Sequence, residues 1–148
     1  MRIQGTQLLP GTPQQVWELF NDPQRLAKLL PGCQGLEPAG PDRYKVAIKF
    51  ALAAFSGAYS GFVELGEQKP PKSMRMRVEG KGAPGFMKGE GRLELAAKGQ
   101  QTEVRYDGEA QVGGLIAAVG QRMIEVAAKK ILHQFFEGAA KLLSEAAN

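Results

Sequence analysis

Alternating polarity with a period of two runs through the middle of this chain and constrains its fold more than any other feature. Five successive runs between residues 44 and 112 show it, most regularly at residues 103–112, where Val104, Tyr106 and Ala110 alternate with polar neighbours. The pattern is typical of β-strands with one buried face and one wet face. Turn residues separate the runs. The middle of the chain therefore predicts an antiparallel meander with short connections.

The two ends of the chain add one strand and three helices. Residues 2–9 predict a strand, Thr12-Pro13 predicts the start of a short helix, and residues 23–30 predict a second one. After Gly113-Gly114 no proline follows, which predicts a helix of about thirty residues, roughly 45 Å long. Its apolar stripe comprises Ile116, Val119, Met123, Ala127, Ile131, Phe135 and Leu142.

Together these elements predict one α+β domain over residues 1–148, with the helix-grip order. A curved antiparallel sheet of about seven strands wraps a long C-terminal helix, and two short helices follow the first strand. No apolar run approaches the ~20 residues of a membrane span, and residues 1–6 lack a signal-peptide layout. Because Cys33 is the only cysteine, we expect a cytoplasmic protein in a reducing compartment.

The positive charge is concentrated in one segment. The formal net charge is +4, yet Lys69–Arg92 alone holds seven lysines and arginines against Glu79 and Glu90. One interpretation is a solvated strand face, and the other is a surface for an anionic membrane or an acidic partner. We expect no nucleic-acid partner, because no aromatic platform is interleaved with these charges.

Small residues on the inner side of the strands suggest a cavity. They are Gly61, Gly89, Gly91, Gly108 and Ala110. Small side chains on a concave face leave volume unfilled, although glycines also let strands bend and bulge. The first interpretation predicts a pocket for an apolar ligand between sheet and helix. The side chains expected to line it are Phe50, Tyr59, Val63, Met76, Tyr106, Met123 and Phe135.

No motif indicates catalysis or a metal site. Residues 80–85 match G-x-G-x-x-G, but a strand pattern follows them, so they predict a hairpin loop. His133 is the only histidine and lies on the polar side of the long helix, and no base is near Cys33 in sequence. At the hairpin tip, Phe86-Met87 could cover the pocket or touch a membrane, or one of the two packs inward. We therefore expect no enzyme, no metal and no cofactor other than a bound quinone or lipid.

Three stretches carry a family resemblance. They are Val16-Trp17 through Cys33; Lys88-Gly89-Glu90-Gly91 with Thr102-Glu103-Val104-Arg105-Tyr106; and Val112 through Ile124, ending in Gln134-Phe135-Phe136. In them the chain resembles the G-subunit family of carbon monoxide dehydrogenase, within the START-like (SRPBCC) superfamily of polyketide cyclases, lipid carriers and pollen allergens.

The resemblance implies an accessory role and no known catalytic residues. The enzyme served would be a molybdenum-containing carbon monoxide dehydrogenase or a related hydroxylase, through maturation, membrane recruitment or delivery of a quinone. Some members extend into a C-terminal hydrophobic anchor, whereas this chain stops at Asn148. We therefore expect transient, peripheral contact with the inner membrane face. Gly120, Gln121 and Arg122 are expected to be structural or partner-facing.

Three functional hypotheses follow from these observations. The first is a carrier for a quinone- or lipid-like molecule. The second is a ligand-free interaction module that recruits a dehydrogenase to a partner or membrane through the Lys69–Arg92 face. The third, ranked last, is a small cyclase-type enzyme in which Tyr59 and Tyr106 orient the substrate.

Overall fold

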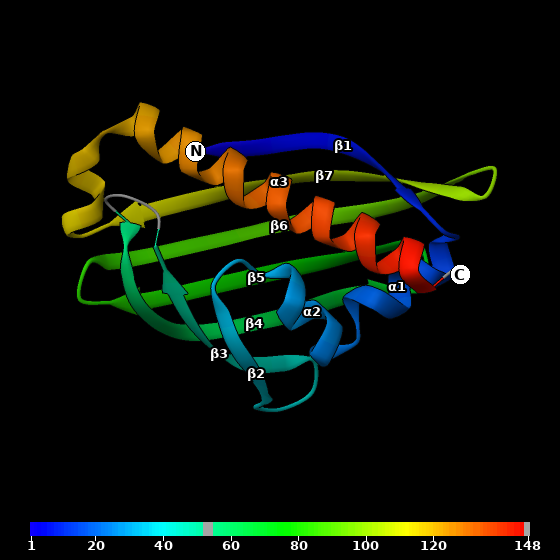
Figure 1. Ribbon diagram of the computed structural model, residues 1–148, viewed down its shortest axis with the longest axis horizontal. Coiled ribbons are helices and arrows are strands. Elements are labelled where there is room, and N and C mark those ends of the chain that lie inside the picture. The colour runs from blue at the N-terminus through cyan, green and yellow to red at the C-terminus, as the bar shows by residue number, and fades with distance from the viewer. Residues whose placement is uncertain (52–54, 147–148) are drawn as a thin grey trace.

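The computed structural model describes residues 1–51 and 55–146 and has a seven-stranded antiparallel sheet wrapped around one long helix (Figure 1). The strands lie in the order β1-β7-β6-β5-β4-β3-β2, so all neighbours except β1 and β7 are consecutive in the chain. The predicted helix-grip fold is confirmed. The elements are β1 (Arg2–Pro10), α1 (Pro13–Phe20), α2 (Pro23–Leu29), β2 (Cys33–Pro38), β3 (Arg43–Phe50), β4 (Gly57–Lys69), β5 (Ser73–Gly82), β6 (Gly85–Lys98), β7 (Gln101–Gly113), η2 (Leu115–Val119) and α3 (Gln121–Ala146).

Local signals in the sequence start the two short helices. At α1, Thr12 and Gln15 form a capping box: the Gln15 amide donates to Thr12 Oγ1 (3.3 Å), and the Thr12 amide donates to Gln15 Oε1 (2.8 Å). At α2, the Asp22 carboxylate accepts from the Gln24 amide (3.1 Å) and from Arg25 (2.8 Å). The hydrogen bond from Arg25 holds the pKa of Asp22 below its usual value. Proline follows each cap at the first helical position.

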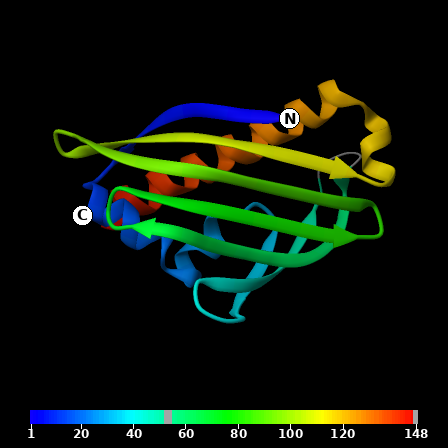
Figure 2. The same ribbon diagram turned by 180° about the vertical axis from the view of Figure 1, so that it is seen from behind.

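The long helix α3 crosses the concave face of the sheet diagonally, and no helix covers the opposite face in the rear view (Figure 2). Its C-terminal half lies beside α1 and α2 and buries Phe135, Phe136, Ala139 and Leu143. The helix does not run unbroken from Gly114. Gly120, at φ +96°, separates the 3-10 helix η2 from α3, so Ile116 precedes the long helix.

Two apolar clusters hold the domain together. The larger one joins α1, α2 and the C-terminal half of α3 to the sheet, with Phe20, Leu26 and Val104 fully buried. The smaller one lies at the other end of α3, where Ile116 of η2 packs with Tyr59 and Ala127. The sheet and α3 are therefore packed at both ends of the helix. Between these two ends, side chains do not fill the middle of the concave face.

The outer face of the sheet carries a network of ion pairs that the local charge count did not predict. Arg75 and Arg92 both lie within 4 Å of Glu67, and Arg77 lies 3.5 Å from Glu64. Those two glutamates belong to β4, outside the segment whose charge was counted. The arginines of Lys69–Arg92 are therefore largely neutralised across strands, and its excess charge resides mainly on lysines. Exposed pairs of this kind contribute about 0–1 kcal/mol each.

Candidate ligand-binding cavity

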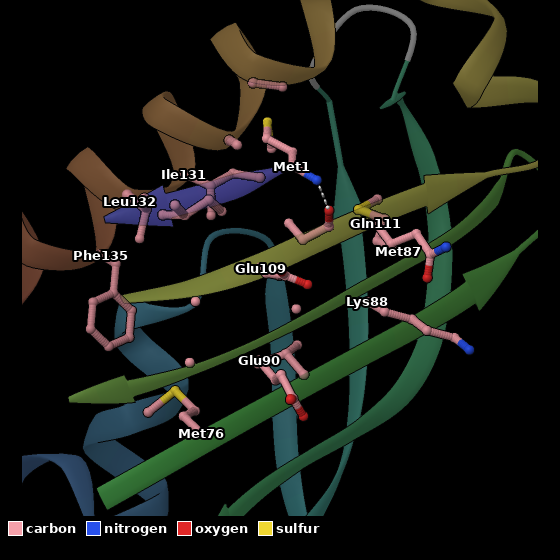
Figure 3. A pocket seen from close by; sticks show the side chains of 18 of the residues that line it. Met1, Met76, Met87, Lys88, Glu90, Glu109, Gln111, Ile131, Leu132 and Phe135 are labelled. Atoms are coloured by element: carbon pink, nitrogen blue, oxygen red, sulfur yellow. Dashed lines mark hydrogen bonds between the residues drawn. The ribbon is translucent and has the colours of Figure 1, made fainter. Parts of the chain in front are cut away.

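A cavity of about 300 Å³ lies between α3 and the middle of the concave face. Figure 3 shows Met76 and Met87 of the sheet around the same space as Ile131, Leu132 and Phe135 of α3. Several charged residues of β6 and β7 also border it, but strand alternation directs their side chains to the outer face. Glu90, for example, pairs there with Arg77. The surface offered to a ligand is consequently almost entirely apolar.

Glycines form much of the floor of this cavity. Gly89 pairs with Ala110, and Gly91 pairs with Gly108, on neighbouring strands. A Cβ atom added to Gly89 would meet nothing closer than the Glu109 carbonyl oxygen at 4.0 Å, so the space above it is open. A larger residue at Gly89 would place its side chain in the open middle of the sheet, as side chains fill its two ends.

Other glycines on the inner face are required for a different reason. A Cβ atom at Gly61 would collide with the Glu79 carbonyl oxygen, and one at Gly108 would collide with that of Glu90. These two glycines allow neighbouring backbones to approach closely where the sheet curves. Both interpretations of the inner glycines therefore hold, at different positions: Gly89 leaves volume, whereas Gly61 permits curvature.

Five of the seven residues predicted for the pocket do border the cavity. They are Phe50, Tyr59, Met76, Tyr106 and Phe135. Two do not. Val63 has no exposed surface and lies in the larger apolar cluster, and the Met123 side chain is 47% exposed on the outer side of α3. Ligand contact by the five remains a prediction.

The sequence reasoning missed residues on two elements. Ile124 and Ala128 on α3 border the cavity, as does Ile3 on β1. The spacing of Ile124, Ala128 and Ile131 leads to Phe135 in steps of four, three and four, which marks a single helix face. That spacing would have found the helix residues once Phe135 was taken as the anchor.

The tyrosines play different parts in this site. The Tyr59 hydroxyl donates to the Phe55 carbonyl oxygen at 2.9 Å, and burial raises the pKa of Tyr59. The Tyr106 ring stacks on Phe136 with centroids 5.3 Å apart. Tyr44, the third tyrosine on the inner side, does not border the cavity. Tyr59 therefore uses its hydroxyl within the fold, whereas Tyr106 borders the cavity and its hydroxyl lies over Gly5 of β1.

Replacing Tyr59 by phenylalanine is expected to cost about 1 kcal/mol of stability, because the Phe55 carbonyl loses its buried donor. Ligand affinity should change by less than about threefold. Urea denaturation and ligand titration measure the two quantities. Tyr106→Phe is the matched control, with the larger effect expected on affinity. A Tyr59→Phe variant of unchanged stability and much weaker binding would show that this hydroxyl serves the ligand instead.

Cys33 and His133 each have a local hydrogen-bonding or ion-pair partner. Burial raises the pKa of the Cys33 thiol, which donates to the Gly35 carbonyl oxygen at 3.5 Å. The His133 side chain is 75% exposed, and its Nε2 lies 2.9 Å from the Glu137 carboxylate. Within residues 1–51 and 55–146, no cluster of three His, Cys, Asp or Glu side chains could hold a metal ion. Nor does any helix in those two ranges combine the length and apolar character needed to cross a membrane.

At the tip of the β5–β6 hairpin, the neighbouring apolar residues Phe86 and Met87 have different surroundings. Residues 80–85 form the end of the β5–β6 hairpin, as expected from the strand pattern that follows them. Met87 points to the concave side and borders the cavity, whereas the Phe86 ring lies 5.6 Å from the Lys88 ammonium. One of the two apolar residues thus packs inward.

A curved antiparallel sheet around a long C-terminal helix is the START-like helix-grip fold, and here an apolar cavity lies between the two. The chain belongs to the CoxG family, which takes its name from the G subunit of carbon monoxide dehydrogenase, and the model of that family matches residues 5–144. Among curated proteins, none matches the chain in sequence.

Solved structures of similar fold extend this comparison. A conserved protein from Geobacillus kaustophilus is 35% identical with a TM-score of 0.95, over 99% of this chain and 97% of that one. A START superfamily protein from Mycobacterium smegmatis is 12% identical with a TM-score of 0.75, over 98% of each chain. The Zhui aromatase/cyclase of a Streptomyces species is 13% identical with a TM-score of 0.68, over 100% of this chain and 96% of that one. The last two likenesses are to the fold alone.

Proposed function

We propose that this protein carries an apolar, quinone- or lipid-like small molecule as an accessory subunit of a molybdenum-containing carbon monoxide dehydrogenase or related hydroxylase. The observation that carries the proposal is the 300 Å³ apolar cavity, which is open above Gly89 of its floor. A volume of this size lies at the lower end of the range for small-molecule sites. It suits a ring system or a short isoprenoid segment, and a longer tail would extend beyond the cavity.

The apolar lining of the cavity favours a carrier over an enzyme that converts its ligand. Burial of apolar ligand surface contributes roughly 25 cal/mol per Å², so such a wall binds without many polar contacts. Tyr106 is the side chain that could orient a polar group, through its hydroxyl. The cyclase hypothesis needs a tyrosine pair, but the Tyr59 hydroxyl already donates to Phe55. The family to which the chain belongs, named for a component of carbon monoxide dehydrogenase, supports the accessory role.

The ligand-free interaction module has weaker support. It relied on the positive charge of Lys69–Arg92, but Arg75 and Arg77 are engaged with glutamates of neighbouring strands. A packed core would also have served a pure interaction module, whereas this domain leaves the middle of its concave face open. A cavity of this kind has a direct use in a carrier.

Added ligand tests the carrier proposal. A short-chain ubiquinone at about 100 times its dissociation constant should stabilise the fold by roughly 2.7 kcal/mol. For a domain of this length, that corresponds to a rise in Tm of about 5–11 °C. Differential scanning calorimetry with ubiquinones, menadione and a single-chain fatty acid measures it. If none of these ligands raises Tm, and none shifts the amide NMR signals of β5–β7, the proposal is wrong.

A further inference from the structure

Methionine side chains are concentrated at the walls of the cavity. The chain has five methionines, and three of them, Met1, Met76 and Met87, border the cavity. Figure 3 shows Met76 and Met87, which come from the neighbouring strands β5 and β6, around the same space. The other two lie away from it: Met74 is 1% exposed within the larger cluster, and Met123 is 47% exposed on the outer side of α3.

Met76 and Met87 face the cavity from its two ends. Met76 packs against the larger apolar cluster and Met87 against the smaller one, and both side chains are half-buried. Between β5 and β6, Met76 lies opposite Gly91, and Met87 lies opposite Gly80. Because glycine has no side chain, neither methionine is covered from that neighbouring strand. Each thioether therefore has room beside it for a small oxidant.

Oxidation of these thioethers would make both ends of the cavity polar. Hydrogen peroxide transfers one oxygen atom to the sulfur: the O–O bond breaks, the sulfur is oxidised to a sulfoxide, and the peroxide is reduced to water. The new oxygen is a hydrogen-bond acceptor, but the buried Tyr59 hydroxyl already donates to the Phe55 carbonyl oxygen. An apolar ligand that covered the sulfoxide would remove its oxygen from water without supplying a donor, which weakens binding.

We infer that Met76 and Met87 are oxidation sites through which peroxide lowers the affinity of the cavity for its apolar ligand. A methionine sulfoxide reductase reverses the change: a dithiol is oxidised to a disulfide, the sulfoxide returns to the thioether, and its oxygen leaves as water. A bound ligand shields both sulfurs, so the empty carrier is the form that is oxidised rapidly. The inference concerns the regulation of the proposed carrier site and rests on that proposed function.

Peptide mass spectrometry after timed exposure to hydrogen peroxide measures the oxidation rate of each methionine in the full chain. In the empty protein, Met76 and Met87 should be oxidised at least about tenfold faster than the buried Met74. A short-chain ubiquinone at about ten times its dissociation constant fills about nine-tenths of the sites, so it should slow both by roughly tenfold. Oxidation of Met123, outside the cavity, should keep the same rate.

Titration with the same ubiquinone and with N-phenyl-naphthylamine, a neutral fluorescent probe of apolar sites, measures the affinity. Oxidised wild type should bind both at least about tenfold more weakly than the reduced protein. Treatment with methionine sulfoxide reductases and dithiothreitol should restore binding. Met76→Leu combined with Met87→Leu keeps an apolar wall of similar volume, so its affinity should be the same before and after peroxide. Met123→Leu is the matched control and should lose affinity on oxidation as the wild type does.

Three results would overturn the inference. They are equal affinity of the oxidised and reduced wild type, a loss of affinity that persists in the Met76→Leu and Met87→Leu double variant, and loss of the cooperative urea transition on oxidation. The last would mean that peroxide unfolds the domain instead of changing its cavity. The reduced protein separates the two proposals. If it binds neither probe, the carrier function is wrong, whereas binding that peroxide does not weaken refutes the oxidation switch alone.

Discussion

Replacing Gly89 by leucine is expected to lower the affinity for the apolar ligand by more than about tenfold while the fold stays intact. The leucine side chain would enter the open space above the cavity floor, where an added Cβ meets nothing closer than 4.0 Å. It would also cover exposed apolar walls, so Tm should stay the same or rise by a few degrees. Ligand titration and calorimetry on the same samples measure both effects.

Gly66 provides the control for this substitution. It lies on β4 opposite Arg75, and therefore on the outer face, and an added Cβ there also meets nothing within 4 Å. Gly66→Leu should leave ligand affinity unchanged. If Gly89→Leu binds as tightly as the wild type, the ligand does not occupy this cavity. Equal losses in both variants would indicate a general effect on the sheet.

The second large effect concerns stability and separates two glycines that face each other across neighbouring strands. Gly61→Ala is expected to destabilise the fold by about 2–3 kcal/mol, because its Cβ would collide with the Glu79 carbonyl oxygen. Gly80, its partner in register, has room: the nearest atom to an added Cβ there is the Tyr59 Cβ at 3.5 Å. Gly80→Ala should be neutral or stabilising by up to about 1 kcal/mol.

Urea denaturation of this pair tests the cause assigned to the curvature of the sheet. The two variants should differ by at least about 2 kcal/mol at equal m-values. Equal stability of Gly61→Ala and Gly80→Ala would mean that close backbone approach at Gly61 is not needed for the fold. In that case the curvature would need another cause.

The architecture could be predicted because strand periodicity and helix caps are local signals. Thr12, Pro13 and Gln15 lie within four consecutive residues and define where α1 begins without help from the rest of the chain. Alternation likewise assigns each strand residue to a face, so Met76 and Tyr106 were correctly placed on the concave side. Local sequence patterns therefore determine whether a segment is a helix or a strand, and on which face of the sheet each strand residue lies.

Alternation does not say how far the cavity extends along a strand. Val63 shares the inner face with Tyr59 but lies four residues farther along β4, where the larger cluster fills the space. The position of that boundary depends on how α1 and α2 pack against the sheet. Such packing joins segments far apart in sequence, and no periodicity records it.

The predictions of which α3 residues face the cavity and of the charge on Lys69–Arg92 were wrong for related reasons. The break at Gly120 separates η2 from α3, and within α3 the cavity face is set by Ile124 and Ala127, which leaves Met123 outside. Glu67, which pairs with both Arg75 and Arg92, comes from β4, and the pairing of β4 with β5 and of β5 with β6 brings it near them. Both errors arose from treating a continuous stretch of sequence as a continuous structural unit.

The most direct test of the carrier account is mass spectrometry of the organic extract from protein purified from its native host, with Gly89→Leu purified in parallel. The account predicts a quinone or lipid in near-stoichiometric amount from the wild type and little from the variant. An equal amount of the same molecule from both would contradict the assignment of this cavity. A wild-type extract without such a molecule, together with no rise in Tm on adding quinones or fatty acid, would contradict the carrier function itself.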